Sequence, residues 1–338
     1  MERIQIGHGS GGRLTQDLIK GVFLKHLLSP ALNELTDAAR IKIGNKSFAF
    51  TTDSYVVKPL FFPGGDIGSL SVFGTVNDLL MMGARPQAVS LGLIIEEGFP
   101  INLLNKITAS ASRAAKQAEV EIVAADTKVV GKNEADKIFI NTSGIGEIIK
   151  GIRLSAKSIR PSDKIIINGP VGDHGLAILG QRQELNFDFR IKSDSAPLNN
   201  LVLGLLGKMR RDSGAIKFMR DPTRGGLATV LNEIAQSTDL GIILDENSIP
   251  VNKSVRAACN ILGLDPLYIA NEGKVVLVID KNYVNMALDI MKRLPDGKDS
   301  CIIGELNKRY KGKAILNTCV GGERILDMLT SDPIPRIC

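Results

Sequence analysis

Short runs of apolar and β-branched residues alternate along the chain with longer segments in which apolar residues recur every three or four positions. The short runs favour strands and the longer segments favour helices, because side chains alternate across a strand and repeat about every 3.6 residues around a helix. Strands are predicted at residues 47–52, 87–95, 121–125, 137–149, 164–168, 215–219, 241–244 and 275–279. Helices are predicted at residues 14–28, 67–82, 101–118, 196–209, 227–237 and 251–262. This mixture predicts an α+β fold.

A charged, proline-containing stretch near residues 152–162 separates two groups of predicted elements. Such stretches are typical of domain boundaries. With 338 residues and 44% apolar content, the chain is long enough for two ordinary cores. We therefore predict an N-terminal domain at residues 1–152, a C-terminal domain at residues 153–325 and a tail at residues 326–338.

The tail ends in the sequence SDPIPRIC, residues 331–338. Pro333 and Pro335 lack a backbone donor and hold the segment extended, so we expect an arm of eight residues that reaches about 26 Å. Cys338 carries a thiol at its tip, and Arg336 adds a fixed cation. Because chain ends are commonly frayed, an incidental cysteine on a free end is the alternative interpretation.

Composition and charge argue against several classes of function. Aromatic residues make up 4% of the chain and the net charge of +6 is interspersed, so no nucleic-acid partner is expected. The four cysteines have no CxxC spacing, which argues against a zinc site or a thioredoxin motif. Because no secretory segment and no membrane-spanning apolar run is present, we expect a cytoplasmic protein with no membrane partner.

Three aspartates stand where a carboxylate is either costly or well placed for a ligand. Asp53 and Asp126 each follow a predicted apolar strand, where open sheets present ligand-binding groups. Asp78 lies inside the apolar helix at residues 67–82, where a charge needs a counter-charge or a cation. Together with the cation of Lys128, the three would suit Mg²⁺ and a polyphosphate. A turn cap at Asp53 and a buried ion pair at Asp78 are the alternatives.

Two glycine-rich segments give only weak signals. GHGSGG at residues 7–12 is predicted to be an irregular loop, and it lacks the Gly-Lys-Ser/Thr ending of a P-loop. GPVGDHG at residues 169–175 joins a strand to a helix and could offer amides to phosphate, with His174 as a possible general acid. A tight structural turn explains the second segment equally well.

Two further turns present carboxylates. Asp221 precedes the paired glycines Gly225 and Gly226 at the start of a predicted helix, which could cradle an anion. Glu272 lies in the turn NEGK between apolar segments, from which a carboxylate can act as a base. An exposed turn residue is the alternative for Glu272.

Together these stretches resemble the HypE family of hydrogenase-maturation factors. That family lies within an ATP-using superfamily that includes aminoimidazole ribonucleotide synthetase, selenophosphate synthetase and thiamine-phosphate kinase. The resemblance covers nearly the whole chain and rests on TTDSYVV from residue 51, VNDLLMMGARP from 76, DTKVV from 126, GDHG from 172, DPTRGGL from 221, NEGK from 271, GGERILDML from 321 and PRIC from 335. Two departures are Ala125, where the family usually has Gly, and residues 332–334, which replace a commoner Gly-containing approach to PRIC.

The resemblance implies a two-domain PurM-like fold. Its N-terminal sheet would form a barrel across a homodimer, with nucleotide near the interface, and its C-terminal domain would be an α/β sandwich. It also implies an ATP-dependent carbamoyl dehydratase. In such proteins the terminal cysteine, here Cys338, receives a carbamoyl group from HypF. ATP-dependent dehydration then leaves a thiocyanate, and the cyanide passes to a HypC–HypD complex for the iron centre of a nickel-iron hydrogenase.

The resemblance also assigns residues. The expected catalytic residues are Cys338 as carrier, Glu272 as base and Lys128 as a balancing cation, and the expected Mg²⁺ ligands are Asp53, Asp78 and Asp126. The expected ATP-binding residues are Asp53, Asn77, Asp78, Asp126, Thr127, Asp221, Gly225 and Gly226. The alternatives are a synthetase or kinase of the same superfamily acting on a free small molecule, and a non-catalytic carrier whose thiol tail docks on a partner.

Overall fold

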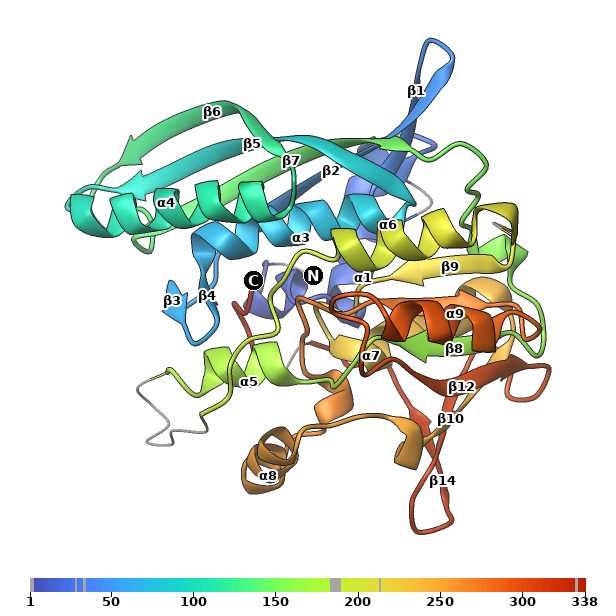
Figure 1. The fold of residues 1–338 in the computed structure, drawn as a ribbon. Helices are drawn as coiled ribbons and strands as arrows, with labels where there is room; N and C mark the ends of the chain where they lie inside the picture. The colour runs from blue at the N-terminus through green and yellow to red at the C-terminus, as the bar shows by residue number, and fades with distance from the viewer. Residues whose placement is uncertain (1–2, 28, 33–34, 183–189, 213, 332–333) are drawn as a thin grey trace.

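The computed structural model describes residues 3–27, 29–32, 35–182, 190–212, 214–331 and 334–338. It contains a five-stranded sheet, a seven-stranded sheet and a two-stranded ribbon, with helices between and around them (Figure 1). The five-stranded sheet comes from the first half of the chain and the seven-stranded sheet from the second. The predicted α+β fold is confirmed.

The five-stranded sheet has the order β1-β2-β7-β5-β6. Its neighbouring strands are antiparallel, except that β5 and β6 are parallel. The strands are β1 (Ala39–Ile43), β2 (Lys46–Tyr55), β5 (Ala84–Glu96), β6 (Glu121–Val130) and β7 (Ile138–Ile148), and the separate ribbon is β3 (Phe61–Phe62) with β4 (Gly65–Asp66).

Two helices, α3 (Ile67–Met81) and α4 (Ile101–Gln117), pack on one face of this sheet, while its other face, called the outer face below, carries exposed side chains such as Phe50 and Ile94 (Figure 1). Asp66 caps α3, because its carboxylate accepts from the backbone amides of Gly68 and Ser69. Nearly all of α3 is buried, and five of its residues, Val72, Phe73, Val76, Leu80 and Met81, share one core with α6 (Asn199–Lys208) and α9 (Val284–Lys292) of the second half.

The seven-stranded sheet has the order β14-β13-β10-β12-β8-β11-β9 and is covered on both faces. On β8, Ile166 packs into the core with α6 and α9, while Ile165 and Ile167 pack with α7 (Gly226–Thr238). A strand buried on both sides reads as a continuous apolar run, which explains the sequence KIII. The strands are β8 (Lys164–Ile167), β9 (Ile216–Arg220), β10 (Gly241–Asp245), β11 (Val276–Ile279), β12 (Cys301–Asn307), β13 (Ala314–Asn317) and β14 (Glu323–Leu326).

Shorter helices connect and flank these layers. They are η1 (Ile6–Gly9), α1 (Arg13–Leu18), η2 (Ile19–Phe23), α2 (Leu24–His26), η4 (Ala156–Ser158), α5 (Asp173–Leu179), η5 (Arg210–Asp212), η6 (Glu246–Ser248), α8 (Lys253–Leu262) and η7 (Pro266–Tyr268). In the described part of the chain, no helix combines the length and the apolar character that crossing a membrane requires.

Two strands run further than predicted. Asp53 lies inside β2, where it pairs with Thr142, and Asp126 lies inside β6, where it pairs with Gly92. The expectation that each aspartate follows its strand is therefore wrong. The ladders continue because the neighbouring strands extend past both aspartates, a long-range effect that local hydrophobicity does not report.

Two local expectations also need correction. Residues 7–12 are not wholly irregular, since η1 includes the first three of them. The helix expected at residues 14–28 is split by the π-helical segment η2, and residue 28 lies outside the described residues.

The two groups of elements meet near the expected link. Its residues 156–158 form η4, and the amide of Ser155 donates to the carbonyl oxygen of Lys217 at 2.8 Å. Leu326, assigned above to the tail, is the last residue of β14. The domain limits themselves stay a prediction.

The packing of α3 on α4 depends on a glycine. A Cβ atom at Gly68 would lie 2.3 Å from the carbonyl oxygen of Ile107, whereas one at Gly207 in α6 would meet nothing within 4 Å. We expect Gly68→Ala to lower the free energy of unfolding by about 1–3 kcal/mol, because the backbone of α4 must move. Gly207→Ala should leave it unchanged or raise it by up to about 1 kcal/mol. Urea denaturation of the two variants checks this; equal stabilities would contradict the packing argument.

Candidate active site

Five carboxylates from both halves of the chain form one cluster, called the acidic cluster below. Asp78 on α3 accepts a hydrogen bond from the Thr51 hydroxyl of β2 at 2.8 Å. The charges of Asp221, Asp37 and Asp53 each raise the pKa of Asp78. The charges of Asp221 and Asp53 also raise the pKa of Glu272. The members are Asp37, Asp53, Asp78, Asp221 and Glu272, and four of them were predicted as site residues.

Burial makes this cluster electrostatically costly. Desolvation, reinforced by the neighbouring carboxylates, holds the pKa of Asp78 and the pKa of Glu272 well above their usual range. For the same reasons the pKa of Asp221 rises to about 8, although Arg220 opposes the rise. The site therefore favours protons, or cations brought by a ligand, around these side chains.

Arg220 is the first of two cations that partly balance the cluster. It pairs with Asp37 at 3.1 Å and with Glu233 on α7 at 3.2 Å. Burial raises the pKa of Asp37 to about 6 against the lowering effect of Arg220. Sequence reasoning missed Asp37 and Glu233, because neither lies in a recognisable motif and both meet Arg220 only in the folded chain.

Arg224, in the DPTRGG loop, is the second cation. Its guanidinium lies 4.0 Å from the carboxylate of Asp53. The negative charge at Cys338 is the largest influence that raises its pKa; burial opposes this, and Asp53 and Asp78 add to it. Arg224 thus stands between the acidic cluster and the tip of the chain, although the sequence analysis assigned it no role.

Asn271 positions the two loops that deliver Asp221 and Glu272. Its side-chain amide donates to the carbonyl oxygen of Pro222 at 2.9 Å, and its oxygen accepts from the amide of Gly172 at 2.8 Å. Because Asn271 is fully buried, these bonds fix the loops without competition from water.

The paired glycines of the DPTRGG loop are required by its geometry. Gly225 and Gly226 both have positive φ, 72° and 61°. A Cβ atom at Gly226 would lie 2.6 Å from the carbonyl oxygen of Ile269. The loop can therefore lie flat against the segment before Glu272 only with glycine at this position.

Asn77 joins α3 to the segment around Glu272. Its amide nitrogen donates to the carbonyl oxygens of Ala196 and Glu272, and its oxygen accepts from the amide of Leu198. Both ends of this side chain are therefore engaged with backbone. In this arrangement Asn77, predicted to bind cofactor, holds the loop of Glu272 in place.

A buried ion pair supports the same loop. Lys274 pairs with Asp194 at 2.8 Å, and the carboxylate of Asp194 also accepts from the amides of Glu272 and Gly273. Burial raises the pKa of Asp194, but the charge and hydrogen bond of Lys274 outweigh it and the pKa ends below its usual range. The carboxylate thus stays ionised and anchors the NEGK turn.

Asp126 and Lys128 are not brought to the acidic cluster within one chain. Their exposed side chains pair with each other at 2.7 Å on β6. Asp53 lies three strand spacings away, about 14 Å. The strand register aligns Asp53 with Ala125 across the sheet, so Asp126 and Lys128 project from the outer face while Asp53 faces the helices. Thr127, between them, is also exposed at this edge strand.

The predicted Mg²⁺ set is likewise divided. Asp53 and Asp78 lie in the cluster and Asp126 lies outside it. Among the described residues, no group of three or more His, Cys, Asp or Glu side chains is arranged to hold a metal ion by itself. The carboxylate oxygens of Asp78 and Asp221, whose pKa values are raised, nevertheless suit Mg²⁺. This hard cation commonly binds one or two carboxylates and takes its other ligands from water and phosphate.

The described end of the tail, residues 334–338, lies along the chain that follows β2 and bends at Ile334 and Arg336, and Arg336 has a positive φ of 56°. The amide of Val56 donates to the main-chain oxygen of the last residue, Cys338, at 3.0 Å, and the amide of Lys58 donates to the carbonyl oxygen of Arg336 at 3.1 Å. Figure 1 places this end between the two sheets, beside α5 and the β3–β4 ribbon. Pro333 lies outside the described residues.

Side chains secure this segment, called the arm below, at its base. Arg336 pairs with Asp136 at 2.6 Å, and Lys58 pairs with the same carboxylate at 2.9 Å. Arg182 donates to the carbonyl oxygens of Pro335 and Arg336. The arm therefore docks with its tip near Arg224 and the acidic cluster, but its described part is bent at Arg336 and is not extended throughout as expected.

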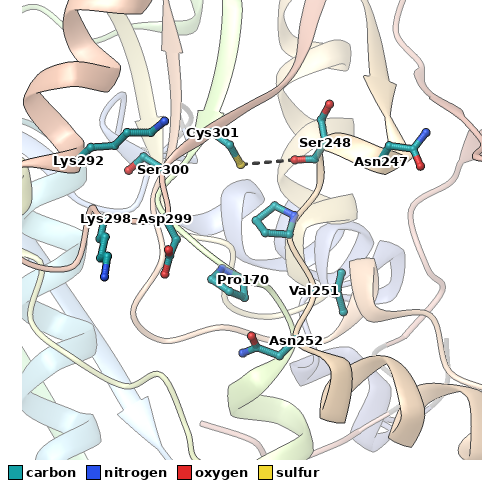
Figure 2. A pocket seen from close by; sticks show the side chains of 11 residues that line it. Pro170, Asn247, Ser248, Val251, Asn252, Lys292, Lys298, Asp299, Ser300 and Cys301 are labelled. Carbon is teal, nitrogen blue, oxygen red and sulfur yellow. Dashed lines mark hydrogen bonds between the residues drawn. The ribbon is translucent and has the colours of Figure 1, made fainter.

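A hollow of about 540 Å³ opens elsewhere on the second half of the chain. In Figure 2 Cys301 donates a weak hydrogen bond to the carbonyl oxygen of Ser248 at 3.4 Å within it. Its two lysines, Lys292 and Lys298, are accompanied by Asp299, so its charge is nearly balanced. None of the lining residues belongs to the acidic cluster. The hollow is therefore separate from the candidate active site.

The fold and the site define a class of protein with two successive family domains. Residues 35–148 match the AIR synthase related protein, N-terminal domain, and residues 160–317 match its C-terminal domain. A putative hydrogenase expression/formation protein of Methanocaldococcus jannaschii is 48% identical over 98% of each chain. The carbamoyl dehydratase HypE of Rhodobacter capsulatus is 44% identical over 100% of this chain and 98% of its own.

Solved structures agree with these matches. A HypE–HypF complex contains a chain 48% identical to this one, with a TM-score of 0.86 over 92% of this chain and 99% of that one. HypE in complex with ATP is 46% identical, with a TM-score of 0.81 over 99% of this chain and 100% of that one. The chain belongs to the AIR synthase related family and, within it, to the HypE family. The resemblance stated from the sequence motifs is confirmed.

The raised pKa values give stability a definite pH dependence. At neutral pH the folded chain binds protons on Asp221 that the unfolded chain has released, so stability falls as pH rises from about 4 through about 8. Asp221→Asn removes this charge, and we expect it to flatten the dependence and to raise the free energy of unfolding at pH 8 by about 1–3 kcal/mol. Urea denaturation between pH 5 and pH 8.5 measures both effects.

Asp289→Asn, at an exposed position on α9, is the matched control and should leave the pH dependence as it is. If Asp221→Asn kept the parental slope, or lost stability at pH 8, the electrostatic description of the cluster would be wrong.

Proposed function

We propose that this chain is a carbamoyl dehydratase that converts a carbamoyl group on the sulfur of Cys338 into a thiocyanate at the expense of ATP. One observation carries the proposal: in a HypE-family chain, the thiol-bearing tip docks beside a buried acidic cluster. Cyanide formed in this way would supply the iron centre of a nickel-iron hydrogenase.

The reaction balances as follows. The carboxamide oxygen attacks the γ-phosphorus of ATP and displaces ADP. The carbon–oxygen bond then breaks, phosphate leaves with that oxygen, and the two nitrogen-bound protons are lost as the carbon–nitrogen triple bond forms. The net change is loss of one water from the carboxamide, coupled to conversion of ATP into ADP and phosphate. Phosphorylation is needed because an amide oxygen is a poor leaving group.

Residue roles follow from this balance. Cys338 carries the substrate, and Glu272 takes a proton from nitrogen. Burial raises the pKa of Glu272, which makes its carboxylate a stronger base once it is ionised. Arg224, which faces both the tip and Asp53, is placed to stabilise negative charge on the transferred phosphoryl group.

Nucleotide binding is assigned to the cluster and its loops. Asp53, Asp78 and Asp221 would hold Mg²⁺, which neutralises phosphate charge when bound, with the phosphates supplying the remaining ligands. Gly225 caps helix α7 and Gly226 begins it, and the N-terminus of a helix favours a bound anion. Asn77 supports the loop of Glu272 from α3.

We also propose a homodimer formed through the outer face of the five-stranded sheet. Phe50 and Ile94 are 43% exposed on that face, an uncovered apolar surface in the single chain. Asp126, Thr127 and Lys128 would lie at the interface and would serve nucleotide binding or catalysis from there.

The proposed partners follow from the chemistry. HypF would deliver the carbamoyl group, since a HypE–HypF complex is known for a relative, and a HypC–HypD complex would accept the cyanide. A cytoplasmic location is part of the same proposal.

Glu272→Gln tests the assignment of the base. We expect the loss of water from the carbamoylated protein to slow by at least about 100-fold, because the amide side chain cannot accept the nitrogen proton. ATP binding should remain, since removing a negative charge favours a polyanion. Intact mass of carbamoylated protein at intervals after ATP addition measures the rate, and isothermal titration measures binding.

Two controls accompany it. Glu305→Gln, which breaks a partly exposed pair with Lys164, should react normally. Cys338→Ala should gain no carbamoyl group yet still bind ATP. Undiminished dehydration in Glu272→Gln would remove this residue from the mechanism, and turnover without the arm would favour a synthetase or kinase acting on a free small molecule.

Ile94→Lys tests the dimer. A charge on the outer face would be buried without a partner in the proposed interface, so we expect this variant to be monomeric at micromolar concentration. Ile261→Lys, at a 63% exposed position on α8, is the control and should stay dimeric. Light scattering after size-exclusion chromatography gives the mass; a dimeric Ile94→Lys protein would rule out this interface.

A further inference from the structure

The last peptide bond of the arm is held by a histidine that the proposed chemistry does not use. The Nε2–H of His174 donates to the carbonyl oxygen of Ile337 at 2.7 Å, and Nδ1 accepts from the hydroxyl of Ser193 at 2.8 Å. These directions follow because a carbonyl oxygen only accepts, which leaves Nδ1 of the neutral ring as the acceptor. The ring is fully buried, and it makes an edge-to-face contact with the ring of Phe62, with 5.6 Å between the two ring centroids.

Burial lowers the pKa of this histidine, against the raising effects of Asp194 and of the bond to Ile337. The ring is therefore a neutral, fixed donor. The general-acid role considered from the sequence does not suit it, because both of its nitrogens are already engaged.

The helix that carries this ring is bonded to the loop that carries the base. In α5 and the turn before it, the amide of Gly172 donates to the Asn271 side chain at 2.8 Å, and the amide of Gly175 donates to the carbonyl oxygen of Ala270 at 3.1 Å. These two acceptors directly precede Glu272 in the chain. The histidine and the base thus share one rigid frame.

Two hydrogen bonds on either side of Cys338 fix its backbone and so restrict the directions in which its thiol can point. The histidine fixes the peptide plane between residues 337 and 338, and the amide of Val56 holds the main-chain oxygen of Cys338. We propose that His174 is the positioning residue of the arm: it locks the last peptide so that the group on the Cys338 sulfur faces the acidic cluster. This inference rests on the proposed function and adds a residue to it.

Carbamoylation requires the arm to be released, whereas dehydration requires it to be docked. A docked arm lies against Val56 and Lys58, so it is not at the same time presented to a separate carbamoyl donor. The arm must therefore exchange between docked and released forms, and a weaker docking bond shifts that exchange toward release. Loss of the bond should slow dehydration without slowing carbamoylation, whereas a general structural defect would slow both.

Two isosteric variants separate the bond from the ring. His174→Gln can place an N–H where Nε2 lies and should keep the bond to Ile337, while His174→Asn places its amide only where Nδ1 lies. We expect His174→Asn to dehydrate a carbamoylated arm at least about tenfold more slowly than His174→Gln in a single turnover, because small misplacements of reacting groups are costly. ATP affinity and the rate of carbamoylation by HypF should be equal in the two.

Trypsin provides a readout that needs neither ATP nor carbamoyl. Cleavage after Arg336 releases the dipeptide of residues 337–338, and the docked arm protects that bond. Intact mass should show at least about fivefold faster loss of the dipeptide from His174→Asn than from His174→Gln. This result stands even if the proposed dehydration were wrong, so the two hypotheses can fail separately.

Ser193→Ala gives the same test with the histidine in place, should His174→Asn fail to fold. It removes the hydroxyl that donates to Nδ1, so the ring can carry its proton on Nδ1 instead of Nε2. In that tautomer Nε2 has a lone pair and cannot donate to Ile337, which weakens the bond on average. Faster trypsin release than in the parent protein supports the inference. Equal protection of the arm in the Gln, Asn and Ser193→Ala variants that fold, or equal dehydration rates in the Gln and Asn pair, would overturn it.

Discussion

Negative charge held out of water is the constraint on which this site depends. Asp78, Asp221 and Glu272 are buried together, and two arginines do not fully compensate them. Such an arrangement lowers the stability of the chain by itself, and it becomes favourable when a ligand adds positive charge. In the proposed function, the same cost that weakens the fold favours binding of a cation-bearing polyphosphate.

The surrounding loops meet this constraint by using backbone contacts in place of additional charges. Asn77 and Asn271 engage carbonyl and amide groups from segments far apart in sequence, and the Asp194–Lys274 pair anchors the turn between them. None of these side chains needs to touch a substrate. Their common effect is to prevent the carboxylates from moving apart, which is how repulsion between like charges would otherwise be relieved.

Much of the fold could be predicted from the sequence, because apolar periodicity and the Asp66 cap are local signals. Asp53, Asp78, Asp221 and Glu272 could be named as site residues, since a carboxylate in an apolar context is conspicuous. The side of the sheet on which Asp126 lies could not, because one residue of register reverses the face and register depends on distant partners. The pairing of Asp37 with Arg220 and the contact of His174 with the tip are equally long-range.

The central helix α3 has a consequence for how turnover can occur. It is packed against its own sheet and against α6 and α9 of the other half, so a hinge motion that parted the two halves would expose a continuous hydrophobic core. In the proposed reaction, movement is therefore confined to the arm while the two halves stay packed. Each turnover would then order and release only a few residues, which keeps the loss of conformational entropy small and lets one active site act on a substrate tethered to its own chain.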